Sequence, residues 1–362
     1  MAETKLKQQA VQPEFFNSSM ARQAILNGNF DVHQRFNGSA KTIPVGVSTY
    51  ELDRWHDYTA ADGGTLPTLL RSRNLLTFGD IPNSFAFTRL NVNGAGTSLG
   101  VNSIHYFRQD IEFGTRYLCG AGKKLTLSFW AKSDITNKKL GLYGVQNYGT
   151  GGSPTSPEVI NATNWTLTSN WTKYTYTFTT NTLSGKTFGT NYDDTFDIAF
   201  SFMWGSNFGY LVGSTGVAQT FVGSGNIDIA QVQVCAGEVA LPFVPQTYAQ
   251  ESANCRRYCR VFGTGTVGDF IGACYWNTTA SALVTVPFDV PMRKEPILES
   301  ATNTWESHTG VAATFIGVNS TYSSIYACVL DFQGMTGGAA AGDSVAVRAK
   351  DTTAKIVISA DI

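Results

Sequence analysis

Hydrophobic and polar residues alternate along most of the chain with the two-residue period of half-buried β-strands. In LTLSFWAK (125–132) the residues Leu125, Leu127 and Phe129 share one face, whereas Trp130 lies on the other. FDIAFSFMW (196–204) has the same alternation, and Gly-rich turns separate the segments of this kind. Over about two hundred residues this pattern predicts eight or nine strands in a two-sheet sandwich or jelly roll.

One stretch, TYAQESANCRRYCRVF (247–262), departs from this alternation and has the three-to-four-residue spacing of a helix. Thr247 and Gln250 have the spacing of a capping box, and Gly263 supplies a stop signal. The pattern therefore predicts a short linking helix over 247–263. The residues expected on one of its faces are Tyr248, Ser252, Cys255, Cys259 and Phe262.

After the helix the alternation returns, with about six strands expected. Three prolines, at 287, 291 and 296, place the segment around them at a sheet edge or corner. The whole chain is thus expected to be all-β, with a jelly-roll β-sandwich at 24–246 and a second, smaller β-sandwich at 264–362. Residues 1–23 are polar and predict an N-terminal attachment arm, with a disordered tail as the alternative.

Composition supports a turn-rich β-protein and argues against several function classes. Charged residues make up 15% of the chain, compared with about 25% in an ordinary soluble domain. Aromatic residues make up 12%, and there are 36 glycines. The net charge of −1 does not favour nucleic acid or an acidic membrane. No apolar run approaches the ~20 residues of a membrane helix, and the first residues lack the apolar core of a signal peptide.

The six cysteines are expected to be free, buried thiols, because no secretion signal is apparent and the environment of synthesis is reducing. Cys255 and Cys259 would point into one packing surface of the predicted helix. No histidine lies near this pair in the sequence, so a zinc site is not favoured.

Five blocks in the order NGNFD, YELDRW, KLTLSFWAKS, SNWTKYTYTFT and GNIDIAQVQVCAGEVA, followed by ESANCRRYCRVF, resemble a known group of proteins. The order is similar to the jelly-roll carbohydrate-binding modules attached to xylanases. It resembles still more the version of that fold in phage tail-fibre and virion proteins. The resemblance covers roughly residues 24–300. It implies a structural virion protein assembled in the host cytoplasm, with a small β-domain after the helix.

The resemblance also implies a metal site, although no cofactor is expected to be required. In the carbohydrate-binding modules a structural calcium lies where the opening motif meets the last strand. The matching positions here are Asp31 and Asp228. Two carboxylates with backbone carbonyls suit calcium, which takes six to eight oxygens. The alternative is that both acids cap turns or accept hydrogen bonds from neighbouring amides.

Aromatic side chains are the candidates for sugar binding, because their flat faces stack on pyranose rings. Trp130 lies opposite the predicted core face of its strand, and three further aromatics flank a long Gly/Ser/Thr/Pro loop. The alternative for each is packing in the core. The predicted ligand-binding residues are Trp130, Tyr143, Tyr148 and Trp165.

Catalysis is not expected. Glycoside hydrolysis needs two carboxylates about 5–10 Å apart in a cleft. Asp110 and Glu112 share a strand face, but Arg108 beside them is typical of a solvated strand. Asp193 and Asp194 are adjacent in a turn-like segment. No nucleophile motif, phosphate loop or dinucleotide fingerprint is present in the sequence.

The favoured function is a tail fibre or related receptor-binding fibre of a tailed phage that recognises a host surface glycan. The expected partners are two further copies of the chain in a homotrimer, other virion proteins through the N-terminal arm, and the glycan. Nucleic acid and membrane insertion are not expected. A capsid decoration or head-fibre protein, and a non-catalytic carbohydrate-binding accessory protein, remain as alternatives.

Overall fold

The structure is a computed structural model that describes residues 20–35, 40–263, 265–335 and 340–361. Most of the predicted N-terminal arm, residues 1–19, lies outside this range. The chain divides into two compact units, with the division between Glu251 and Ser252, and each is described by itself. Among the described residues, every helix is too short or too polar to cross a membrane.

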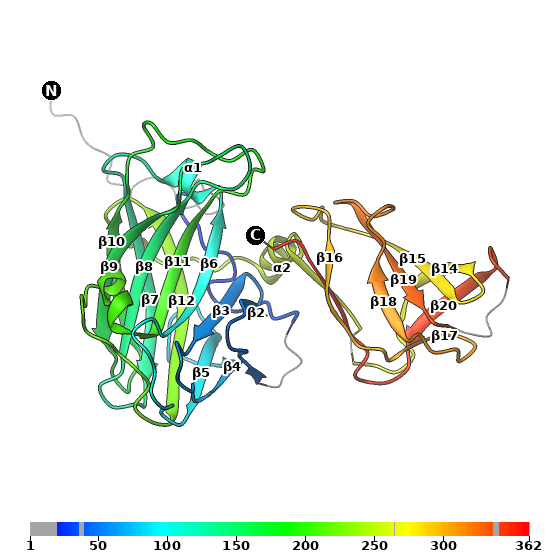
Figure 1. Cartoon of the computed structure of the whole chain (residues 1–362), viewed down its shortest axis with the longest axis horizontal. Coiled ribbons are helices and arrows are strands. Elements are labelled where there is room, and N and C mark those ends of the chain that lie inside the picture. The colour runs from blue at the N-terminus through cyan, green and yellow to red at the C-terminus, as the bar shows by residue number, and fades with distance from the viewer. Residues whose placement is uncertain (1–19, 36–39, 264, 336–339, 362) are drawn as a thin grey trace. The chain divides into compact units, whose positions relative to one another are not determined.

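Over its described residues the first unit consists of two six-stranded antiparallel sheets (Figure 1). In spatial order, the first sheet contains β1 (Lys41–Thr42), β4 (Thr68–Leu75), β5 (Ala86–Asn93), β12 (Gly225–Ala236), β7 (Lys124–Ser133) and β10 (Thr172–Thr179). The second sheet contains β2 (Thr49–Leu52), β3 (Trp55–Ala60), β6 (Ile104–Glu112), β11 (Thr195–Trp204), β8 (Lys139–Asn147) and β9 (Glu158–Thr166).

The order of these strands confirms the jelly-roll β-sandwich. The chain crosses between the sheets at β1–β2, β3–β4, β5–β6, β6–β7, β7–β8, β9–β10, β10–β11 and β11–β12, so strands adjacent in space are often distant in sequence. Such crossings need two apolar inner faces to pack against one another. The core between the sheets includes Trp55, Phe107, Phe129 and Phe200, all fully buried. Two short helices, α1 (Gly114–Leu118) and the 3₁₀ helix η3 (Ser206–Val212), accompany the described strands of this unit.

The opening NGNFD motif holds the start of the chain against β12. The backbone N–H of Val232 donates to the carbonyl oxygen of Gly28 at 2.8 Å. A Cβ atom at Gly28 would lie 2.1 Å from the Val232 carbonyl oxygen, so only glycine fits this close approach. The Asn27 amide donates to the carbonyl oxygens of Val32 and Asp53 and accepts from the Val32 N–H, which fixes the turn.

The second unit is a smaller β-sandwich, as predicted. Over the described residues it has a three-stranded and a six-stranded sheet. The three-stranded sheet contains β13 (Cys259–Phe262), β21 (Ile356–Ser359) and β16 (Ile297–Ala301). The six-stranded sheet contains β17 (Trp305–Ser307), β20 (Ser344–Ala349), β14 (Phe270–Thr278), β15 (Ser281–Pro287), β19 (Ala327–Gln333) and β18 (Phe315–Val318). The proline-rich segment after β15 leads from one sheet to the other, as its composition indicated.

The linking helix is shorter than the predicted 247–263. Helix α2 covers Tyr248–Arg256, and Cys259–Phe262 forms strand β13. This strand pairs with β21 from Cys259↔Ser359 to Phe262↔Ile356. The local sequence spacing does not reveal a pairing with residues about a hundred positions later. The helical spacing therefore predicted a helix that extends past Arg256, where α2 ends. The first strand of the second unit therefore begins at Cys259, before the predicted boundary at residue 264.

All six cysteines are free and buried, which confirms the expectation of packed thiols. Cys255 and Cys259 are both buried, but one belongs to α2 and the other to β13. They therefore do not share a helix face.

The N-terminus of α2 provides a first testable prediction. The backbone N–H of Gln250 donates to the hydroxyl of Thr247 at 3.3 Å, as the capping signal predicted. Thr247→Ala should lower the free energy of unfolding by about 1 kcal/mol, measured by urea denaturation. Thr247→Ser keeps the hydroxyl and should behave like the native chain. Equal loss in both variants would contradict the capping role.

Candidate functional site

The structure does not bring the four predicted sugar-binding aromatics together. Trp130 lies half-buried on the outer face of the first sheet, where it packs in a cluster with Ile81 and Phe87. Its indole N–H donates to the side-chain oxygen of Gln231 at 3.1 Å. Trp165 is half-buried against the core between the sheets, with its ring centroid 5.4 Å from that of Phe129.

Tyr143 and Tyr148 require a correction, because both are buried and neither presents a ring face to a ligand. Tyr143 packs with Trp204 and Leu211 beside η3. Tyr148 donates its hydroxyl to a carboxylate oxygen of Glu158 at 2.6 Å. The loop that they flank is long and polar, but its aromatic neighbours stabilise the fold.

The two predicted metal ligands have different partners. Asp31 accepts a hydrogen bond from the Asn29 amide at 3.3 Å. Burial raises the pKa of the Asp31 carboxyl, while Asn29 and the charge of Arg73 oppose this shift. Asp228 accepts from Arg89 through both oxygens, at 2.7 and 2.9 Å, and Lys132 lies 3.9 Å away.

The sequence interpretation of Asp228 as a calcium ligand is therefore corrected, since an arginine already occupies both of its oxygens. Within the described ranges, no three or more His, Cys, Asp or Glu side chains gather in a way that could hold a metal ion. Asp31, with Arg73 nearby and Asn29 on one oxygen, does not on its own offer the six to eight oxygens that calcium takes.

A different group of side chains does come together on the outer face of the second sheet. Phe107 of β6 and Phe200 of β11 point into the core, so the residues directly before and after each of them in its strand point outward. The register pairs Asp110 with Asp197 across β6 and β11, and Tyr58 with Tyr106 across β3 and β6. We call Tyr58, Tyr106, Arg108, Asp110 and Asp197 the outer-face cluster.

The outer-face cluster has a half-exposed aromatic part. The rings of Tyr58 and Tyr106 are stacked, with centroids 5.4 Å apart and an interplanar angle of 25°. Both side chains are half-buried, and the guanidinium of Arg108 lies 5.6 Å from the centroid of Tyr106. Apolar ring surface thus lies directly beside a cationic hydrogen-bond donor.

Four positions along β6 from Tyr106, two buried carboxyl groups on the same outer face share one arginine. Arg108 Nε is 2.7 Å from Asp110, and its NH1 is 3.7 Å from Asp197. Burial by itself would raise the pKa of Asp110, but Arg108 and His56 outweigh it and hold that pKa below its ordinary value. Burial and the neighbouring Asp110 raise the pKa of Asp197 to about 7. Asp110 is therefore the carboxyl that ionises readily, whereas ionisation of Asp197 as well is unfavourable.

His56, which contacts Ser48, also lies against Arg108. His56 Nε2 lies 3.0 Å from Arg108 Nε and 3.5 Å from a carboxylate oxygen of Asp110. His56 Nδ1 lies 2.5 Å from the hydroxyl oxygen of Ser48. Arg108 Nε therefore lies within 3.0 Å of both Asp110 and His56, which together set the orientation of the guanidinium.

The sequence interpretation of Arg108, Asp110 and Glu112 as a solvated strand was wrong for Asp110, which is 4% exposed. The alternation along β6 correctly places these residues on one face. The burial of Asp110 depends on β11, which lies next to β6 but about ninety residues later in the chain. The sequence of β6 alone does not indicate which strand will lie beside it.

No protein-family model and no curated protein matches the chain. Several solved structures are similar to it in part. The enzymatically active domain of tailspike protein 4 of bacteriophage CBA120 is 16% identical over 60% of this chain and 22% of its own, with a TM-score of 0.33. The N-terminal cellulose-binding domain of β-1,4-glucanase C from Cellulomonas fimi is 18% identical over 55% of this chain and 99% of its own, with a TM-score of 0.30.

A xylan-binding domain (CBM22-2) from Paenibacillus barcinonensis is 16% identical over 46% of this chain and 88% of its own, with a TM-score of 0.27. All three TM-scores are below 0.5.

Proposed function

We propose that the chain is a non-enzymatic glycan-binding protein and that the outer-face cluster is its binding surface. The stacked, half-exposed Tyr58 and Tyr106 beside Arg108 support this proposal. A pyranose ring has an apolar face of C–H groups and an edge of hydroxyls. The tyrosine rings would cover the apolar face, while Arg108 would donate to the hydroxyl oxygens.

The charges of the cluster favour a neutral glycan. Arg108 is already paired with Asp110 and lies near Asp197, so its positive charge is compensated. A carboxylated or sulfated sugar would bring a further negative charge toward these two carboxyls, and like charges at close range destabilise a complex. Hydroxyl groups carry no such cost.

The positions of the two carboxyls favour binding over hydrolysis. Asp110 and Asp197 are 4% and 2% exposed. Asp197 accepts from the Thr195 hydroxyl at 2.5 Å, and Asp110 pairs with Arg108. A glycosidase needs one carboxyl positioned to protonate the leaving oxygen and a second at the sugar ring. Carboxyls that lie beneath the accessible surface serve instead to orient the arginine.

The wider role that we propose is that of a tail fibre or related receptor-binding fibre of a tailed phage. The ordered motifs from NGNFD to ESANCRRYCRVF support it. Individual sugar contacts are weak, so a homotrimer would strengthen binding to a host surface through multivalency. A head-fibre role and a free carbohydrate-binding accessory role are the alternatives. Imaging of the labelled chain on virions separates them, because only a tail fibre would lie at the tail.

Tyr106→Ala tests the binding proposal. We expect the affinity for a neutral glycan, first identified on a glycan array and then measured by calorimetry, to fall by roughly tenfold, which corresponds to about 1.4 kcal/mol. Tyr106→Phe keeps the ring and should retain most of the affinity. Tyr192→Ala removes another exposed tyrosine of the same unit and serves as the control. Unchanged affinity in Tyr106→Ala would refute this surface.

A further inference from the structure

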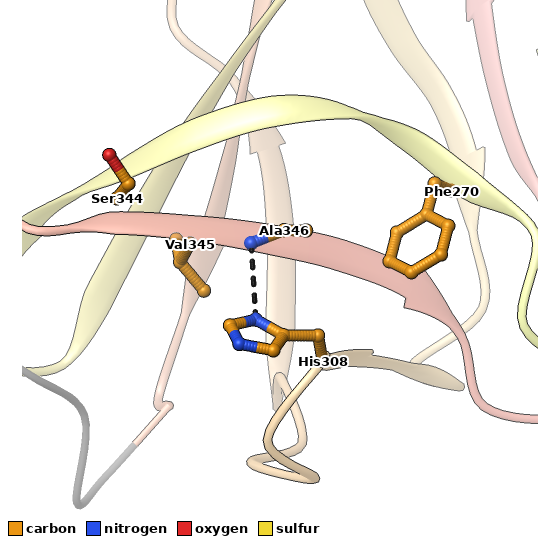
Figure 2. A pocket seen from close by; sticks show the side chains of 5 residues that line it. All are labelled: Phe270, His308, Ser344, Val345 and Ala346. Carbon is orange, nitrogen blue, oxygen red and sulfur yellow. Dashed lines mark hydrogen bonds between the residues drawn. The ribbon is translucent and has the colours of Figure 1, made fainter.

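The second unit contains a surface hollow of its own, apart from the outer-face cluster. It has a volume of about 390 Å³ and is lined by Phe270, His308, Ser344, Val345 and Ala346. This volume lies within the ~300–1,000 Å³ of small-molecule sites. Figure 2 shows the rings of Phe270 and His308 on the same side of β20, flanking the backbone of Ala346.

Phe270 provides the apolar wall of the hollow. Its side chain is 61% exposed, although it belongs to β14 next to β20 in the middle of the sheet order. The register between β14 and β20 shifts between Phe270 and Gly272. A bulge of this kind redirects a side chain from the regular alternation of a strand. The exposed ring is thus held by a local feature of the sheet and not by a loop.

His308 provides a fixed polar wall. Its backbone N–H donates to the carbonyl oxygen of Ala346 at 2.8 Å, and the Ala346 N–H donates back to His308 Nδ1 at 3.4 Å (Figure 2). Because Nδ1 accepts a hydrogen bond, the neutral imidazole carries its proton on Nε2. A ligand in the hollow would therefore meet a donor held by two hydrogen bonds to one residue of β20.

The five lining residues suit an uncharged ligand with one apolar face and polar edges. None of the five has a carboxylate, ammonium or guanidinium group. Phe270 offers a ring face, His308 an N–H donor and Ser344 an exposed hydroxyl. A purely apolar ligand would leave the two polar groups without partners, and an ionic ligand would meet no opposite charge in this lining. A pyranose satisfies both parts of the lining.

We propose that the hollow formed by Phe270, His308, Ser344 and Ala346 is a second sugar-contact site, which takes a pyranose unit of a neutral glycan. The inference rests on the proposed function, because it assigns the same class of ligand to the second unit. Each chain would then hold two weak sites, and a polysaccharide that engages both is bound more strongly than either site alone would allow.

The test uses the full chain in affinity electrophoresis through gels that contain xylan, mixed-linkage β-glucan or galactomannan. Four chains are compared with the native one: Phe270→Ala, Tyr106→Ala, the double variant and Phe315→Ala. Phe315 is 55% exposed and lies on the edge strand β18 of the same sheet, three strands away from β14, so it is the matched control. Because Phe270 is exposed, its replacement should leave the thermal unfolding midpoint unchanged.

We expect Phe270→Ala to weaken retardation about three- to tenfold, as expected for the loss of one of two linked sites. The double variant should migrate as in a gel without polysaccharide, and Phe315→Ala should match the native chain. The second site is refuted if Phe270→Ala migrates like the native chain and the double variant migrates like Tyr106→Ala. It is also refuted if none of the three polysaccharides retards the native chain. If only Phe270→Ala weakens retardation, the second site stands and the outer-face cluster fails as the binding surface.

Discussion

Replacing Arg71 by alanine is expected to lower the free energy of unfolding of the first unit by about 3–5 kcal/mol, because it leaves a buried carboxylate without its cation. Arg71 and Asp57 are both fully buried. The guanidinium donates to both oxygens of Asp57, at 2.6 and 3.0 Å, and lies 4.1 Å from the ring centroid of Phe107.

The remaining partner of Asp57 does not replace the lost charge. His105 Nε2 lies 3.0 Å from Asp57, but burial lowers the pKa of His105 and keeps the imidazole neutral. Although burial disfavours the ionised form of Asp57, Arg71 and His105 together hold its pKa below the ordinary value. Without Arg71, the carboxyl must either remain charged in an apolar core or take up a proton. Both outcomes cost stability.

Urea denaturation of the two chains measures this effect. Lys186→Ala is the control, because Lys186 and Glu158 form an ion pair in the same unit with both side chains partly exposed. Surface pairs contribute about 0–1 kcal/mol. A loss in Arg71→Ala no larger than that in Lys186→Ala would show that Asp57 is not held by this pair. The double variant Asp57→Asn with Arg71→Met removes both charges and should be less destabilised than Arg71→Ala alone.

The fold class follows from alternation, which is a local property of the chain. Leu125, Leu127 and Phe129 are fully buried on one face of β7, as their spacing predicted, and Trp130 lies on the other. A two-residue period places side chains on two faces whatever the neighbouring strand is. The same local reasoning extended the helix too far, because Cys259 to Phe262 obtain their partners from the distant strand β21.

The outer-face cluster could not be predicted in this way, because it depends on the register between strands. Tyr143 follows the outward alternation of β8, yet it is buried, since η3 packs on that part of the sheet. Tyr58 and Tyr106 lie in strands separated by almost fifty residues and meet only because β3 pairs with β6. The approach of Asp110 to Asp197 needs the pairing of β6 with β11. A sequence states which residues face outward but not which of them become neighbours.

Asp197→Asn is expected to change how the stability of the chain depends on pH. Asp197 has an ordinary pKa of 3.8, which burial and Asp110 raise to about 7 in the folded state. A carboxyl with a raised folded pKa contributes stability that is fully present below its unfolded pKa. That contribution is lost as the pH rises toward the folded pKa. The native chain should therefore lose stability, relative to Asp197→Asn, between about pH 4 and pH 7.

The expected change is on the order of a few kcal/mol, because one unit of pKa difference corresponds to about 1.4 kcal/mol. Asparagine stays neutral and keeps a carbonyl oxygen for the Thr195 hydroxyl, so it removes the charge with little change in shape. Urea denaturation at intervals from pH 4.5 to pH 8 measures both chains. The difference in unfolding free energy should grow with pH in favour of Asp197→Asn and then level off above neutrality.

Asp110→Asn is the matched control, since it removes the other carboxyl of the same pair. The pKa of Asp110 is held below its ordinary value by Arg108 and His56, against the effect of burial. Its carboxylate therefore contributes stability above its unfolded pKa, and that stability is lost as the pH falls. Asp110→Asn also deprives Arg108 of its closest partner, at 2.7 Å, and should destabilise the chain at pH 7. Parallel pH profiles for Asp197→Asn and the native chain would show that the pKa of Asp197 is not raised on folding.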